Sequence, residues 1–513
     1  MAHAFGIGSG GTRLPPRTGS PASSSSSTST LAANVTSTSL STPLSTSSLA
    51  ANTTTTSLST PLSTSSPSGN LAANSTTNST TPSNTTATQS RAVFAHFIVG
   101  NTYNYTVDSW SQDILLAASK GIDAFALNIG SDAWESSQIA NAYTAASKYN
   151  GNTTNAATPF RLFFSFDMGS LPCSTASHAS TLQSYIRTYA NSTSTFKYNA
   201  RMLVSTFAGE SCRFGASTLN QGWTDAIKPT KPPTNGPLPA VWFVPSFFVD
   251  PATFRNLSVI DGAFHWNSGW PMGNYNVTFG PDQSYISNLS GNRTYMAAVS
   301  PWFFTHYGPD TFNKNWIYRG DDWHWAQRWE LLVQNRSSVP LTQVVTWNDY
   351  GESHYVGPIE GIQPMSQSWV NGFDHQGWLD LMQYYIKAYK TGSYPAIAKD
   401  RVFLWARLYP VTATASDSVG KPANYPWTQD YLWAVTLLTA PANVTLTCGS
   451  STQRTLVPAG LSKLKLKLST SCAVNATVAR GASTPVQFSP AGFNFSVRPP
   501  SYNFNAFVAA SPP

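Results

Sequence analysis

Two acidic residues stand three positions apart in the stretch TWNDYGESHY, which covers residues 346–355 of the chain. Asp349 and Glu352 lie there among aromatic residues, and a third acid, Asp167, closes the apolar run RLFFSFD (161–167). Charged residues make up only 10% of the 513 residues, so grouped carboxylates are unusual in this chain. A protonated carboxyl group can donate a proton to a leaving oxygen, while an ionised one activates water or attacks carbon. The three acids therefore predict acid–base chemistry of the kind that hydrolyses glycosidic bonds.

Each acid also has a purely structural interpretation. Acids near helix starts commonly cap the helix, and an acid that ends a strand can simply hold a loop. The Trp-Asn-Asp and Gly-Glu-Ser contexts favour chemistry for Asp349 and Glu352, whereas the two interpretations of Asp167 are evenly balanced. Tryptophans are usually core residues, but at a polar site they can stack on sugar rings. The aromatic and polar residues near strand ends that we expect to contact substrate are His96, Asn128, His265, Trp266, Trp302, His306, Tyr307, Trp347 and His354.

Eight short apolar runs precede or contain these residues. They cover 93–99, 124–130, 161–167, 201–207, 241–248, 262–267, 295–304 and 342–349. Amphipathic helical patterns separate several of them, as at 109–120 and 323–334, which predicts a parallel sheet buried on both faces. Eight such units match a (β/α)₈ barrel better than an open sheet, and no G-x-G-x-x-G follows the first run. Such a barrel would gather the candidate residues at the carboxyl ends of its strands.

The pattern changes after about residue 395. The run LSKLKLKL (461–468) alternates strictly, which predicts a half-buried antiparallel strand with lysines outward and leucines inward. With its neighbours it predicts a small β-sandwich. The predicted domains are therefore a disordered Ser/Thr-rich segment at 1–89, a catalytic barrel at 90–394 and an accessory β-sandwich at 395–513.

The composition points to a secreted glycoprotein. Residues 17–89 are almost entirely Ser, Thr, Asn and Pro with short repeats, and such a segment cannot bury enough apolar surface to fold. Many Asn residues stand in N-x-S/T sequons. We therefore expect a secreted or cell-wall location, although residues 1–20 show no apolar signal-peptide core, which we interpret as an incorrectly assigned start.

The four cysteines support the same compartment. Cys173, Cys212, Cys448 and Cys472 favour two disulfides in an extracellular chain, with three connectivities open. Cys173 with Cys212 and Cys448 with Cys472 each fall within one predicted domain, and we expect the first pair to join the loops after the third and fourth strands.

Several function classes are disfavoured. The net charge is +7, but the basic residues are scattered without a Lys/Arg-rich run, so we expect no nucleic-acid partner. No apolar run of about 20 residues predicts a membrane span. Neither a cofactor motif nor metal-ligand spacing is present, so no cofactor or metal is expected. We expect a monomer.

Five motifs carry a family resemblance. RAVFAHFIVGNTYNYTVDSWSQDILLAASKGIDAFALNIG, FFSFDMGS, SPWFFTHYG, NWIYRGDDWHWAQRWE and TWNDYGESHY together resemble glycoside hydrolase family 71, the fungal α-1,3-glucanases or mutanases. The resemblance runs from about Arg91 into the predicted β-sandwich. It implies hydrolysis of cell-wall α-1,3-glucan with inversion, and it places the essential acids on Asp167, Asp349 and Glu352.

The roles of the three acids are hypotheses. We assign Glu352 as general acid and Asp349 as general base, with Asp167 supporting the sugar or the water from across the site. Endo action is expected, although sequence patterns alone do not separate it from exo action. Two alternatives stay open: a retaining glycosidase on another glucan, and a wall protein that binds glucan without cleaving it.

Overall fold

The computed structural model describes residues 91–152, 154, 158–233 and 235–513. The predicted disordered segment at 1–89 therefore lies outside the described residues. Within the described part, no helix is both long enough and apolar enough to cross a membrane.

Eight parallel strands form the main sheet, and each corresponds to one of the eight predicted runs. They are β1 (Ala92–Ile98), β2 (Ala124–Ile129), β3 (Arg161–Asp167), β5 (Arg201–Phe207), β6 (Val241–Phe243), β7 (Gly262–His265), β8 (Thr294–Val299) and β11 (Leu341–Val344). The short β4 (Lys197–Tyr198) pairs antiparallel with β5.

The strands follow one another around a curled sheet. The paired order is β6-β5-β3-β2-β1-β11-β8-β7, so the last strand, β11, lies beside the first. No ladder joins β6 to β7. Two backbone hydrogen bonds connect these segments, from Asp261 N–H to Phe243 O and from Phe264 N–H to Pro245 O.

Two predicted strands are shorter in the structure because of proline. The run 241–248 ends as a strand at Phe243, two residues before Pro245, and the run 295–304 ends at Val299, just before Ser300 and Pro301. Proline has no N–H to donate to a ladder, so the regular strands end near it; past Pro245 one isolated bridge, Ser246 with Phe207, continues the pairing with β5. The chain then re-forms as the hairpin β9 (Phe304–His306) and β10 (Asn315–Ile317).

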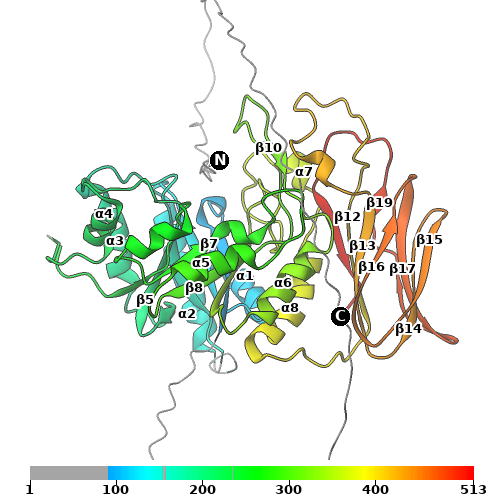
Figure 1. Cartoon of the computed structure of the whole chain (residues 1–513), viewed down its shortest axis with the longest axis horizontal. Coiled ribbons are helices and arrows are strands. Elements are labelled where there is room, and N and C mark those ends of the chain that lie inside the picture. Colours follow the sequence, from blue (N-terminus) through cyan, green and yellow to red (C-terminus); the bar gives the residue numbers. More distant parts are fainter. Residues whose placement is uncertain (1–90, 153, 155–157, 234) are drawn as a thin grey trace, which may run out of the picture. The chain divides into compact units, whose positions relative to one another are not determined.

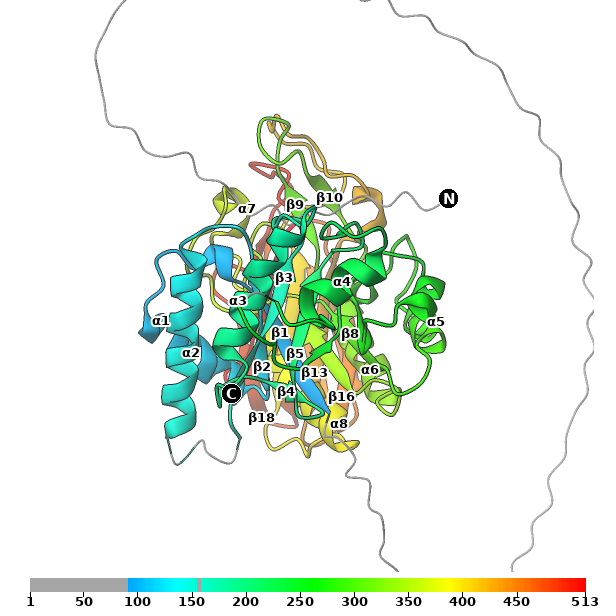
Figure 2. The ribbon, with the colours of Figure 1, turned by 90° about the vertical axis from the view of Figure 1, so that its left-hand side faces the viewer.

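Helices follow most of the strands, and Figure 2 shows helices α1 to α6 around the sheet. They are α1 (Val107–Ser119), α2 (Glu135–Gly151), α3 (Ala179–Tyr189), α4 (Leu219–Ile227), α5 (Gly280–Asn288), α6 (His324–Gln334), α7 (Gln367–Val370) and α8 (Gln376–Thr391). Between β6 and β7 the described chain forms no α-helix but only the short 3₁₀ helix η3 (Pro251–Asn256). A second 3₁₀ helix, η1 (Val99–Asn101), follows β1.

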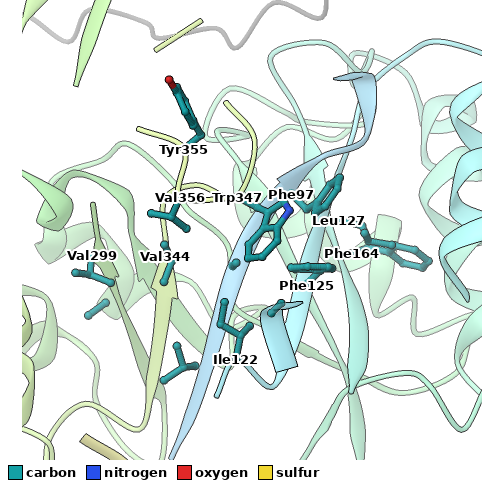
Figure 3. Close-up of a cluster of buried hydrophobic side chains, with 14 of the residues drawn as sticks. Phe97, Ile122, Phe125, Leu127, Phe164, Val299, Val344, Trp347, Tyr355 and Val356 are labelled. Carbon is teal, nitrogen blue, oxygen red and sulfur yellow. The ribbon is translucent and has the colours of Figure 1, made fainter. Parts of the chain in front are cut away.

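Alternation along each strand divides the core into two layers. On β1, Val93, Ala95 and Phe97 belong to the cluster that includes the helices, while Phe94 belongs to a separate cluster inside the curl. Figure 3 shows part of the outer cluster, where Trp347 lies beside Phe97 and Phe125. Successive side chains of a strand point to opposite faces, so every second residue faces inward.

Nine antiparallel strands make up the C-terminal part, shown in orange and red in Figure 1. They are β12 (Arg401–Arg407), β13 (Tyr431–Leu438), β14 (Ala442–Cys448), β15 (Ser451–Val457), β16 (Gly460–Lys467), β17 (Cys472–Arg480), β18 (Ser483–Phe488), β19 (Asn494–Phe495) and β20 (Ala506–Ala510). One sheet has the order β16-β13-β12-β20, and the other has the order β15-β14-β17-β18 with β19 on β17.

The lysines of β16 point away from the leucine face as predicted, and Lys467 is exposed, but Lys463 and Lys465 are partly covered. Leu464 and Leu466 are buried between the two sheets, as expected, but Lys463 forms an ion pair with Glu330 of α6 (2.6 Å). Lys465 lies over the ring of Trp433 (5.3 Å). Residues of α6 and the segment before it therefore cover part of the opposite face of this sheet, and alternation alone could not reveal that second layer. The domain boundary at residue 395 stays a prediction, because one hydrophobic cluster contains both α8 and parts of β12 and β13.

Candidate active site

A cavity at the carboxyl ends of the parallel strands contains all three predicted acids. It has about 700 Å³ of empty space, part of it open to solvent. Its lining residues are Ile98, Gly100, Asn101, Asn128, Gly130, Asp132, Glu135, Asp167, Tyr307, Phe312, Lys314, Asp349, Gly351, Glu352 and Pro364. Five predicted site residues therefore line one cavity: Asn128, Asp167, Tyr307, Asp349 and Glu352.

Strand alternation explains the inward position of Asn128 and Asp167. On β2 and β3 the residues in phase with them, Ala126 and Phe163, belong to the inner cluster. Asp167 is buried, and its Oδ1 accepts a hydrogen bond from the Gly169 N–H (3.0 Å). Asn128 donates to the Ser165 carbonyl (3.3 Å). Both side chains are thus held where the strands end.

The loop after β11 is anchored to β1 by Asn348. The Ile98 N–H donates to Asn348 Oδ1 (2.8 Å), and Asn348 Nδ2 donates to the Ile98 carbonyl (3.0 Å). Within the loop, the Asp349 N–H donates to Thr346 Oγ1 (2.8 Å). The Glu352 N–H donates to Asp349 Oδ1 (3.0 Å). This hydrogen bond from the backbone of Glu352 to the side chain of Asp349 holds the loop in a turn and brings the two carboxyl groups together.

Gly351 has a different role from the one a flexible turn would suggest. A Cβ atom at this position would lie 2.5 Å from the Tyr307 hydroxyl, so only glycine permits the close approach. Tyr307 in turn donates to the Pro364 carbonyl (2.6 Å) and is thereby fixed at the cavity wall.

His354 and Lys314 surround Glu352 with hydrogen-bond donors. His354 Nε2 lies 3.0 Å from Glu352 Oε2 and 3.8 Å from Asp349 Oδ2. Its Nδ1 lies 3.1 Å from Thr346 Oγ1. Lys314, from the β9–β10 hairpin, places Nζ 3.7 Å from Glu352 Oε1. The imidazole is fully buried and packs against Trp270 and Phe303, which also contact each other, so packing helps to set its orientation.

These neighbours separate the two carboxyl groups. Burial, followed by the charge of Glu352, raises the pKa of Asp349 to about 6. Burial also acts to raise the pKa of Glu352, but the His354 hydrogen bond and Lys314 outweigh it and hold that pKa below its usual value. A pair in which one carboxyl keeps its proton and the other stays ionised is what acid–base catalysis requires.

Two predicted residues lie inside the curl beneath the cavity. His96 on β1 packs edge-on against Trp266 (4.8 Å), and its Nδ1 accepts a hydrogen bond from Gln343 Nε2 (3.1 Å). Burial and the nearby His354 lower the pKa of His96 to about 3. His96 therefore stays neutral under the site.

The remaining predicted residues lie away from the cavity lining. Trp302 and Trp347 are core residues, with Trp302 donating to the Phe504 carbonyl (3.1 Å) and Trp347 packing on Phe125 (5.1 Å). His265 stacks on Tyr285, because β7 presents Phe264 and not His265 to the inner face.

His306 is held by residues from two parts of the chain. Its Nδ1 lies 2.9 Å from Asn315 Oδ1 and its Nε2 lies 2.9 Å from Asp417 Oδ2. Substrate contact for these residues off the lining stays a prediction.

Sequence reasoning missed several cavity residues, above all Glu135 and Lys314. Glu135 begins α2, at the end of the loop that follows β2, so applying the strand-end rule to every loop after a strand would have included it. Lys314 lies in the β9–β10 hairpin, which the hydrophobic pattern of the sequence did not predict.

The structure pairs Cys173 with Cys212 and Cys448 with Cys472, as expected. The first bond ties the loop after β3 to the loop after β5, next to the segment that follows Asp167.

One group of side chains in the described part of the chain has the geometry of a metal site. Asp349, Glu352 and His354 each offer an atom, and these atoms all lie within 4.8 Å of one another. Lys314 already supplies a positive charge beside Glu352, which opposes a cation there.

The chain matches the model of glycosyl hydrolase family 71 over residues 89–513. It is 38% identical to the glucan endo-1,3-alpha-glucosidase of Schizosaccharomyces pombe, with 82% of this chain and 94% of that protein covered. It is 32% identical to a mutanase of Penicillium rubens, with 82% and 89% covered. An endo-alpha-mannosidase structure of glycoside hydrolase family 99 from Bacteroides thetaiotaomicron covers 59% of this chain and 99% of its own length, with a TM-score of 0.43 and 9% identity. The family match and the two relatives confirm the resemblance found in the sequence: the chain belongs to glycosyl hydrolase family 71 and is a glycoside hydrolase.

Proposed function

We propose that the enzyme hydrolyses internal α-1,3-glucosidic bonds of fungal cell-wall glucan. The family membership and the names of the two relatives support this substrate. One observation carries the chemistry: the buried side chains of Asp349 and Glu352 line one cavity, and their pKa values are shifted in opposite directions.

Asp349 is the proton donor in this proposal. It keeps its proton up to about pH 6 and loses it as the pH rises further. This reverses the roles assigned from the sequence, because His354 and Lys314 contact Glu352 more closely than Asp349. Ionised Glu352 keeps Asp349 protonated and stabilises the positive charge that develops on the sugar ring.

We propose that Asp167 activates the attacking water. One oxygen of Asp349 and one of Glu352 lie within 4.8 Å, whereas inversion needs carboxyl groups about 6.5–9.5 Å apart. β3 is three strand spacings from β11, about 14 Å along the sheet, and both side chains reach into the same cavity. In this proposal the sugar and the attacking water lie between Asp349 and Asp167. Proton donation by Asp349 and water attack from the Asp167 side then give inversion.

The close Asp349–Glu352 spacing favours a second candidate, a retaining mechanism with Glu352 as nucleophile, for which about 5–5.5 Å is typical. Proton NMR of α-1,3-linked glucan oligosaccharides during the first minutes of hydrolysis separates the two. We expect the β-anomer to appear first. Early accumulation of the α-anomer would overturn inversion and give the nucleophilic role to Glu352.

A leaving-group test checks the assigned proton donor. An α-glucosyl fluoride of an α-1,3-linked oligosaccharide needs little protonation to lose fluoride. Asp349→Asn should therefore retain far more activity on the fluoride than on the glucan, while Asp167→Asn should lose both. If Glu352→Gln were the variant selectively rescued by the fluoride, the proton donor would be Glu352.

We further propose that the curled sheet functions as a complete (β/α)₈ barrel in a secreted or wall-bound monomer. The cyclic strand order and the two hydrogen bonds between the β6 and β7 segments support closure. The two disulfides and the wall substrate support the location. Sedimentation analysis and the culture-medium fraction of the expressed protein test these points.

A further inference from the structure

Glu135 is a buried acid of the cavity to which the proposed chemistry gives no role. The residue is 2% exposed, yet it lines the cavity near Asp167. Its Oε2 accepts a hydrogen bond from the Gly130 N–H (2.7 Å). Among the described residues, Oε1 has no hydrogen-bond partner.

Two glycines of the cavity lining make room for this unpartnered oxygen. A Cβ atom on Gly130 would lie 3.0 Å from Oε1, and one on Gly100 would lie 3.5 Å from it. Both glycines line the cavity and have no side chain, so neither covers Oε1. A ligand or a water in the cavity can therefore hydrogen-bond to Oε1.

The surroundings of Glu135 favour its neutral form. The titratable groups that face it are Asp132 in the preceding loop, Asp167 on β3 and Tyr185 on α3. Burial is the main cause that raises the pKa of Glu135 to about 8, and the two aspartates add to it. At acidic and neutral pH the group is therefore a carboxylic acid that can donate a hydrogen bond.

An aromatic pair stands next to this part of the cavity. Tyr103 is 56% exposed and packs edge-on against Trp134, with ring centres 5.2 Å apart. Asn101 and Asp132, each two residues from one of the rings, line the cavity. Gln138 of α2 donates to the Tyr103 carbonyl (3.3 Å) and the Tyr105 carbonyl (2.9 Å), which holds the loop in place.

We propose that the loops after β1 and β2 form a further sugar-binding subsite of the cavity. In this subsite Glu135 donates a hydrogen bond to a hydroxyl group of one glucose unit, and the Tyr103–Trp134 pair forms the outer edge. The inference rests on the proposed function for the identity of the sugar. It adds a binding wall beside the catalytic loop, on the next strands of the sheet, and predicts that binding at this wall depends on substrate length.

The test measures binding without turnover. Calorimetric titration of Asp349→Asn with α-1,3-linked glucose oligomers of two and six units reports the subsite directly. In that background, Glu135→Ala should weaken hexasaccharide binding about tenfold, because a buried hydrogen bond is lost. Glu135→Gln keeps a donor and an acceptor, so its Kd should stay within about threefold.

The pH profile separates a binding role from a structural one. As the pH rises through about 8, Glu135 loses its proton, so hexasaccharide affinity should fall, while the Glu135→Gln background should show no such fall. Thermal unfolding at each pH controls for stability. Equal affinity in Glu135→Ala, or equal losses in Glu135→Gln and Glu135→Ala, would overturn the proposal.

The outer edge has a matched control. Tyr103→Ala should weaken hexasaccharide binding about three- to tenfold and leave disaccharide binding unchanged. Tyr394→Ala removes another exposed tyrosine of an aromatic pair, the one with Tyr384, and should change neither. Equal effects of the two substitutions on hexasaccharide binding would show that the Tyr103–Trp134 pair is not part of the subsite. A wild-type enzyme that does not cleave α-1,3-glucan would instead overturn the proposed function, whatever the binding data show.

Discussion

Two walls of the same cavity carry carboxyl groups in opposite electrostatic settings. The β11 wall consists of Asp349 and Glu352 with their neighbours His354 and Lys314. The β2 wall carries Glu135, which faces Asp132, Asp167 and Tyr185. On the first wall, donors of hydrogen bonds and positive charge keep one carboxyl ionised. On the second, burial and like charge keep the carboxyl neutral.

The difference shows how one cavity can combine chemistry and binding. A pair of acids with split pKa values suits proton transfer, whereas an acid that stays neutral without an ionised partner suits hydrogen bonding to a sugar hydroxyl group. Both walls carry carboxylic acids, so the groups around each acid, and not the residue type, decide its role.

The largest effects should come from the acids of the β11 wall. Asp349→Asn and Glu352→Gln should each lower kcat/KM on α-1,3-glucan by about 10²–10⁴-fold, the usual contribution of general acid–base catalysis. Glu330→Gln makes the same change outside the cavity, where Glu330 pairs with Lys463, and serves as control. Losses below about tenfold in both cavity variants, with an unchanged Tm, would remove these acids from the chemistry.

The second substitution makes the β11 wall resemble the β2 wall. His354→Phe keeps an aromatic ring against Trp270 and Phe303 but leaves Glu352 Oε2 without its ring N–H partner. His354 lowers the pKa of both acids, so without it both values rise. Glu352 then becomes protonated at a higher pH, so the acid limb of the kcat/KM profile should shift to higher pH. We expect kcat/KM itself to fall about 10–100-fold.

A buried histidine elsewhere provides the comparison for that variant. His265→Phe also replaces a buried imidazole, one stacked on Tyr285 outside the cavity. It should lower the Tm without moving either limb of the pH profile. Identical pH profiles for His354→Phe and wild type would show that His354 does not separate the two acids.

A smaller shift in the same direction is expected from Lys314→Met. Lys314 also lowers the pKa of both acids, but it lies 3.7 Å from Glu352 and is 19% exposed, so water screens part of its effect. We expect kcat/KM to fall about three- to tenfold and the acid limb to move up less than in His354→Phe. Lys314→Arg keeps the charge, so its pH profile should match that of the wild type. A profile like that of Lys314→Met would show that the size and shape of the lysine side chain matter and its charge does not.

The smallest effect tests whether the C-terminal part supports the β11 wall from a distance. Asp417 accepts hydrogen bonds from His306 and from the N–H groups of Val419 and Tyr502, next to the hairpin that carries Lys314. Asp417→Asn should remove about 1 kcal/mol of stability and lower the Tm by about 2–4 °C, with kcat/KM within about threefold of wild type. Differential scanning calorimetry measures this, with the exposed Asp225→Asn as reference. A Tm equal to that of the reference would mean that the contact contributes nothing.

The eight strands were predictable because each is a short apolar run with buried neighbours on both faces. The same property hid which face each residue occupies. Asn128 and Asp167 point into the curl, but His265, which also lies at a strand end, points outward to Tyr285. A run that is apolar at every position does not reveal its inward phase, so His265 could not be separated from the others.

The sequence by itself determined the family, the parallel strands and the position of the acids at strand ends, since periodicity and motif spacing are local properties. Only the tertiary structure decided the partners of those acids. Lys314 reaches Glu352 from a hairpin beside the β11 loop, and Gly351 is required by the approach of Tyr307, 44 positions earlier in the chain. The split in pKa between Asp349 and Glu352 likewise arises from burial and from neighbours that fold around the loop. Electrostatic energies depend on distances of a few ångströms between residues far apart in the chain, and no local pattern encodes such distances.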